Sequence, residues 1–172
     1  MEMTGERIIA APRLRVWQAL NDPDVLQASI PGCKDLAKTS DTSFEATVVQ
    51  KVGPVKATFK GAVELSDIVE GVSYRIDGEG KGGVAGFANG GADIRLEDAE
   101  GGTRLIYAVD AKVGGKLAQL GSRLIDSFAA KLSEDFFTRF QEQIEGPATE
   151  SAQADPETDG AQKKSWLSKL VS

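Results

Sequence analysis

Apolar residues recur at steps of three and four between Gly115 and Glu145, and this spacing predicts one long amphipathic helix. Charged side chains lie on the opposite face of the predicted helix, as expected of a solvent-exposed face. Gly146 and Pro147 end the pattern, because glycine suits a left-handed cap and proline cannot continue a helix. The apolar stripe comprises Leu117, Leu120, Leu124, Phe128, Leu132, Phe136, Phe140 and Ile144.

Between Cys33 and Val113 the apolar positions change to a period of two, which is typical of strands with one buried face. The alternating runs are separated by short segments that contain Gly53, Gly71 and Gly101, which we interpret as turns. We therefore expect a strongly twisted antiparallel meander, whose apolar face is covered by the predicted C-terminal helix.

Two short helices are expected between a first strand, residues 3–10, and this meander. Pro12 opens the first helix, since a proline at the first helical position loses no hydrogen bond. Asp22 and Pro23 break that helix and cap a second one, residues 24–29. The order of elements predicts an α+β fold, in which a curved antiparallel sheet of about seven strands grips a long C-terminal helix.

Small residues occupy many positions that should face the predicted helix. Two arrangements would explain them: the helix presses close with its Phe side chains, or a cavity remains between helix and sheet. The sequence pattern leaves both open. These inward positions include Ala46, Ala57, Gly61, Gly86, Ala88, Ala92 and Ala111.

Composition excludes several classes of function. The chain of 172 residues has a net charge of −6, which argues against a nucleic-acid-binding protein. It contains no histidine, which removes the commonest general base and most zinc sites. Residues 78–83 satisfy G-x-G-x-x-G, but a strand is expected after them, so we interpret this match as accidental. We find no enzyme motif and expect a non-catalytic protein with no metal site.

Beyond residue 145 the composition changes twice. Residues 146–162 contain four acidic and no basic side chains, which predicts a disordered acidic linker. Residues 163–172 predict an amphipathic membrane-anchor helix, with a Trp on its apolar face and lysines around it. An alternative is a tail helix that docks on the same domain or on a partner protein. The predicted anchor residues are Lys163, Lys164, Trp166, Leu167, Lys169, Leu170 and Val171.

The chain resembles the G-subunit family of carbon monoxide dehydrogenase, within the START/Bet v 1-like (SRPBCC) superfamily. The resemblance rests on residues 11–26 with their Asn21-Asp22-Pro23 element, on Ile30-Pro31-Gly32-Cys33, and on 52–55, 59–61 and the helix from 114 onward. It covers residues 1–145 and implies a helix-grip domain with an apolar cavity. It also implies an accessory protein that links a molybdenum-containing carbon monoxide dehydrogenase to the cytoplasmic face of the membrane and to its quinone.

From the pattern and the resemblance together, we expect a quinone, menaquinone or ubiquinone, in a cavity between helix and sheet. Two other functions remain open: a small-molecule enzyme of the polyketide cyclase type, and a membrane-recruitment scaffold with a filled core. The anionic inner face of the cytoplasmic membrane is the expected location. The predicted ligand-binding residues are Phe59, Tyr74, Phe87, Tyr107, Leu120, Leu124 and Phe128.

Overall fold

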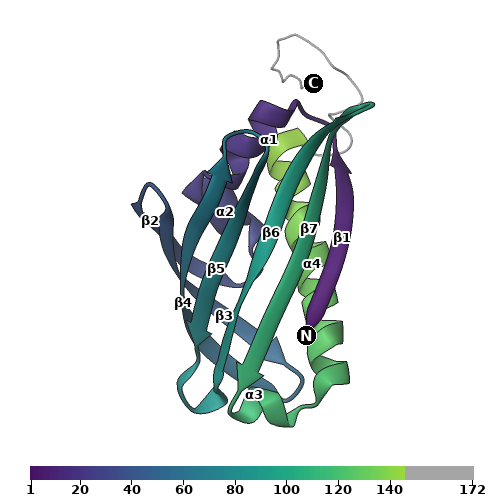
Figure 1. Cartoon of the computed structure of the whole chain (residues 1–172). Helices are drawn as coiled ribbons and strands as arrows, with labels where there is room; N and C mark the ends of the chain where they lie inside the picture. The colour runs from purple at the N-terminus through teal and green to yellow at the C-terminus, as the bar shows by residue number, and fades with distance from the viewer. Residues whose placement is uncertain (146–172) are drawn as a thin grey trace, which may run out of the picture.

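Seven antiparallel strands form one sheet in the order β1-β7-β6-β5-β4-β3-β2. The computed structural model describes residues 1–145; the predicted linker and membrane anchor lie outside the described residues. Helix α4 crosses one face of the curved sheet (Figure 1), which confirms the predicted fold class and the two short helices after β1. The elements are β1 (Glu2–Ile9), α1 (Arg13–Leu20), α2 (Pro23–Ser29), β2 (Cys33–Ser40), β3 (Ser43–Val52), β4 (Val55–Val69), β5 (Ser73–Lys81), the 3-10 helix η1 (Gly83–Ala85), β6 (Phe87–Ala99), β7 (Gly102–Gly114), α3 (Lys116–Gln119) and α4 (Ser122–Glu145).

The predicted single helix from Gly115 to Glu145 is wrong in one respect, because the chain breaks near its start. Gly121 separates α3 from α4 and has a φ of +91°, a left-handed conformation that glycine adopts without a steric penalty. The amide of Gly121 still bonds to the Ala118 carbonyl, so the break is a tight turn rather than an open loop. An apolar period alone does not reveal such a break, since the stripe continues on both sides.

The second half of α4 holds this helix on the sheet. Phe137 and Phe140 are its buried residues, and Phe140 is completely inaccessible to solvent. At the same end, the Glu145 carboxylate accepts a hydrogen bond of 2.8 Å from the Ala10 amide, and Gln141 bonds to the Arg7 side chain of β1. The first half of α4 contributes no fully buried side chain.

Helices α1 and α2 fill the gap between the end of the sheet and the second half of α4. The Asp22 carboxylate caps α2 by accepting a hydrogen bond of 2.9 Å from the Asp24 amide. After α2 the chain turns at Gly32, whose φ of +76° and close approach to the Val49 carbonyl leave no room for a Cβ. Gln50 then donates a hydrogen bond of 2.7 Å to the Pro31 carbonyl. The Ile-Pro-Gly-Cys segment therefore serves to attach α2 to β3.

Among residues 1–145, none of the helices is both long enough and apolar enough to cross a membrane.

Replacing Phe140 with Ala should lower the free energy of unfolding by about 3–5 kcal/mol, because a fully buried ring is lost from the packed end of the core. Chemical denaturation measures this value. Leu14→Ala is the control, since Leu14 is 57% exposed and should lose little stability. Similar losses for the two variants would mean that α4 is not held by its second half.

Candidate functional site

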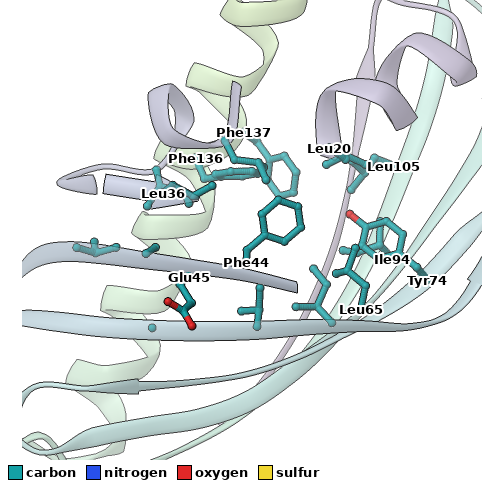
Figure 2. A pocket seen from close by; sticks show the side chains of 17 residues that line it. Leu20, Leu36, Phe44, Glu45, Leu65, Tyr74, Ile94, Leu105, Phe136 and Phe137 are labelled. Atoms are coloured by element: carbon teal, nitrogen blue, oxygen red, sulfur yellow. The ribbon is translucent and has the colours of Figure 1, made fainter. Parts of the chain in front are cut away.

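A cavity of about 360 Å³ lies between the sheet, the two short helices and the second half of α4. Figure 2 shows the rings of Phe44, Phe136 and Phe137 on one side of it and Tyr74 and Ile94 on the other. Its lining is apolar except for Tyr74 and Glu45. The lining residues are Leu20, Leu26, Ile30, Leu36, Phe44, Glu45, Ala46, Val48, Gly61, Val63, Leu65, Tyr74, Ile76, Ile94, Leu105, Phe136 and Phe137.

The sheet is hollowed toward one side of this cavity because its inward side chains are small there. Ala46, Gly61, Gly80 and Ala88 are direct neighbours on four successive strands, β3 to β6. None of them projects far toward α4, and Ala46 and Gly61 form part of the cavity wall. Of the two arrangements that the sequence leaves open, the structure shows the cavity.

Tyr74 supplies the buried polar group of the cavity. Its side chain is 6% exposed, and its ring meets the Trp17 ring edge-on at 5.2 Å between centroids. No residue within 1–145 forms a hydrogen bond with the Tyr74 hydroxyl, which points toward Phe44 and Leu105 in Figure 2. Burial raises the pKa of Tyr74, so the group remains a neutral phenol that can donate one hydrogen bond to a ligand. Glu45, by contrast, is solvent-exposed and lies away from Tyr74.

A second cavity of about 240 Å³ adjoins the first on the other side of a pair of rings. Phe136 and Phe137 line both cavities and pack edge-to-face, with 5.0 Å between ring centroids. Tyr107 lines the second cavity and stacks on Phe137, again at 5.0 Å. Two aromatic side chains therefore lie between two apolar spaces, which also share Ile30 and Ile94 in their linings.

Among the predicted ligand-binding residues, Tyr74 lines the first cavity and Tyr107 lines the second. Phe59 lies on the inner face of β4, where its ring covers Gly82. Phe87 pairs with Gly114 in the register of β6 and β7, packs its ring over that glycine on the outer face and is 43% exposed. The expectation that Phe87 points inward is therefore wrong.

The predicted helix residues lie at the other end of α4 from the cavity. Leu120 precedes the break at Gly121, Leu124 lies within van der Waals contact of Gly53 in the β3–β4 turn, and Phe128 is half-buried. Neither cavity is lined by these three residues. The apolar stripe runs along the whole helix, so the sequence does not indicate which half of the helix lies over the cavity. The prediction placed the cavity under the first half, whereas it lies under the second half.

Sequence reasoning also missed the contribution of the short helices. Leu20, Leu26 and Ile30 line the cavity from α1, α2 and the turn that follows. Their apolar character was visible, but nothing local shows that α2 packs on α4 as well as on the edge strand β2. Phe44, Leu65 and Ile94 alternate in the sequence with polar residues, but nothing in that alternation singles them out as cavity residues.

This architecture defines a helix-grip protein with an internal, ligand-sized apolar cavity. The chain belongs to the CoxG family, the G subunit of carbon monoxide dehydrogenase, whose pattern it matches over residues 5–145. A search of curated proteins gives no significant match.

Solved structures of the same fold include a conserved protein from Geobacillus kaustophilus. It is 31% identical, with a TM-score of 0.78 over 84% of this chain and 95% of that one. The Zhui aromatase/cyclase from Streptomyces sp. R1128 is 12% identical, with a TM-score of 0.62 over 84% and 93% of the two chains. Ara h 8.0201 is 15% identical, with a TM-score of 0.58 over 84% and 97%. The last two show a shared fold.

The raised pKa of Tyr74 predicts a loss of stability in alkali. Above pH 10, about where a tyrosine ionises in an unfolded chain, the unfolded state releases a proton that the buried phenol retains. Stability should therefore fall by up to about 1.4 kcal/mol per pH unit from this group until the folded pKa is reached. Urea unfolding at pH 9 to 11 should show a shallower fall for Tyr74→Phe than for the unmodified chain. Tyr107→Phe is the control, and equal slopes in all three proteins would show that Tyr74 is not buried as described.

Proposed function

We propose that this protein binds a respiratory quinone, menaquinone or ubiquinone, in the cavity beside Tyr74. The observation that supports the proposal is the Tyr74 phenol in the wall of a space whose lining is otherwise apolar except for Glu45. A quinone ring is flat and apolar, and its carbonyl oxygens accept hydrogen bonds. One carbonyl would accept a hydrogen bond from Tyr74, and the aliphatic and aromatic lining would cover the rest of the ring.

The size of the cavity limits how much of such a ligand it holds. A volume of about 360 Å³ is at the small end of the range for ligand sites, roughly 300–1,000 Å³, and suits a ring with a short part of its isoprenoid chain. The adjoining 240 Å³ behind Phe136 would take more of that chain once the Phe136 ring moves aside.

Membership of the family implies an accessory role for carbon monoxide dehydrogenase. In our proposal the partner is the molybdenum-containing enzyme, and the chain is a non-catalytic carrier that connects it to quinone at the inner face of the cytoplasmic membrane. Residues 163–172 would anchor the carrier to that membrane. A linker of 17 residues, 146–162, spans at most about 60 Å, so the domain could reach a docked enzyme while its tail stays at the bilayer.

A bound quinone should co-purify with the protein from its own host and appear as a mass increment in native mass spectrometry. Tyr74→Phe should weaken quinone affinity about fivefold, since one hydrogen bond contributes about 1 kcal/mol. Ala46→Phe should abolish binding, because the added ring occupies the cavity. Both affinities are measured by titrating the purified protein with a short-chain quinone analogue.

Ala62→Phe is the matched control for the blocking variant. It adds the same ring to the exposed outer face of β4, beside Gly61, and should leave affinity unchanged. Native spectra without any ligand, or an Ala46→Phe protein that binds quinone normally, would contradict the proposal.

The tail should give weak, salt-sensitive binding to anionic vesicles. Burial of Trp166, Leu167, Leu170 and Val171 contributes at most about 6–12 kcal/mol, and ordering about ten residues offsets most of it. Lysines at the surface add about 1 kcal/mol each when the lipid is anionic. Co-sedimentation of the full chain and of a chain ending at Gly160 measures the difference, and equal binding by both would exclude the tail as an anchor.

A further inference from the structure

Basic side chains gather at the end of the domain where α4 begins. The β3–β4 turn, η1 and the segment from the end of β7 to the start of α4 meet there, opposite α1 (Figure 1). Residues 51–60, 79–89 and 111–126 contain seven basic and two acidic side chains, in a chain whose net charge is −6. All seven are exposed, and we call this surface the basic tip: Lys51, Lys56, Lys60, Lys81, Lys112, Lys116 and Arg123.

The strand register brings like charges together within the basic tip. Lys51 pairs directly with Lys56 across β3 and β4, and Lys60 pairs directly with Lys81 across β4 and β5. Like charges in facing positions destabilise a sheet. Among residues 1–145, Lys81 alone of these four has an ion-pair partner, Glu79 at 3.8 Å. Like-charge pairs that lower the stability of the sheet suggest that these lysines serve to bind an anionic partner.

Apolar side chains project from the same end. Val84, in η1, is 87% exposed, and Phe87, which follows it, is 43% exposed. Ile68 and Val69 are also exposed at the opposite end of the sheet. The turns there, however, are acidic: residues 64–71 and 97–101 contain six acidic and no basic side chains. The turns at the two ends therefore differ in the sign of their charge, and at the acidic end Arg13 of α1 donates hydrogen bonds to Asp98 and to the Gly71 carbonyl.

We propose that the basic tip docks on an anionic lipid bilayer, with Val84 and Phe87 entering the headgroup region. Exposed apolar side chains surrounded by basic ones are typical of protein surfaces that lie in a membrane interface. An acidic protein partner fits less well, because protein interfaces favour arginine and are depleted in lysine. Six of the seven basic residues are lysines, whose compact charges suit a diffuse anionic surface.

This contact involves the folded domain and is separate from the tail anchor of the proposed function. The test uses the full chain with Trp166→Ser and Leu170→Ser, which weaken the tail without removing it. This tail variant is sedimented with vesicles of phosphatidylcholine alone and with vesicles that also contain phosphatidylglycerol. It should bind the anionic vesicles, bind the neutral ones weakly, and be released by 1 M salt.

Lys56→Gln and Lys60→Gln, added to the tail variant, should each lower the partition coefficient about fivefold, and together about 25-fold. Each removes one member of a like-charge pair, so thermal stability should be unchanged or higher. Val84→Ser should also reduce binding. Arg15→Gln and Ile68→Ser, both at the opposite end, are the matched controls and should have no effect.

Failure of the tail variant to bind anionic vesicles would overturn the basic tip as a membrane contact, even if the unmodified tail binds them. Such a result would instead assign the lysines to an acidic protein partner. Lysine variants that bind no more weakly than Arg15→Gln would also overturn the proposal. The proposal is supported if the tail variant binds anionic vesicles and the lysine substitutions weaken that binding. This outcome does not depend on whether the cavity holds a quinone.

Discussion

The interior of this protein depends on the short reach of the side chains in the middle of its sheet. In one row, Ala46, Gly61, Gly80 and Ala88 are neighbours on β3 to β6, and Ala46 and Gly61 line the cavity. Where a helix crosses such a row, the side chains of the sheet are too short to fill the space between the sheet and the helix. Space is filled where the side chains are long, around Phe140 and Ile9, and it is left open beside Ala46 and Gly61. The cavity is therefore a property of the strand sequences, and α1 and α2 close it.

Tyr74 gives this open space a chemical preference. In the empty protein the Tyr74 hydroxyl forms no hydrogen bond with another described residue, although it can donate one into the cavity. A ligand with an acceptor in the correct position accepts that hydrogen bond, whereas a pure hydrocarbon does not. The Tyr74 phenol alone can thus discriminate among apolar ligands, while Phe44, Leu65 and Ile94 determine the shape of the cavity.

Local patterns in the sequence predict the elements well and the site only in part. Alternation identified the strands, and the Asn21-Asp22-Pro23 and Ile30-Pro31-Gly32 segments marked the ends of the short helices. Tyr74 could be assigned to the inner face because its neighbours alternate with polar residues. The position of the cavity along α4 could not be predicted, because it depends on where α2 packs. Phe87 was misplaced although the alternation of β6 is regular: Ala88 and Ile94 face inward, so the odd position 87 faces outward.

The separation of charge along the strands has a consequence for how the molecule responds to ionic strength. A strand of 13 residues, such as β6, is about 44 Å long. At physiological salt the Debye length is about 8 Å, so a charged surface near one end interacts with that end alone. At 0.01 M the Debye length grows to about 30 Å, and the acidic turns at the far end begin to contribute. The same protein then behaves as an anion at very low salt and as two independent charged surfaces in the cell.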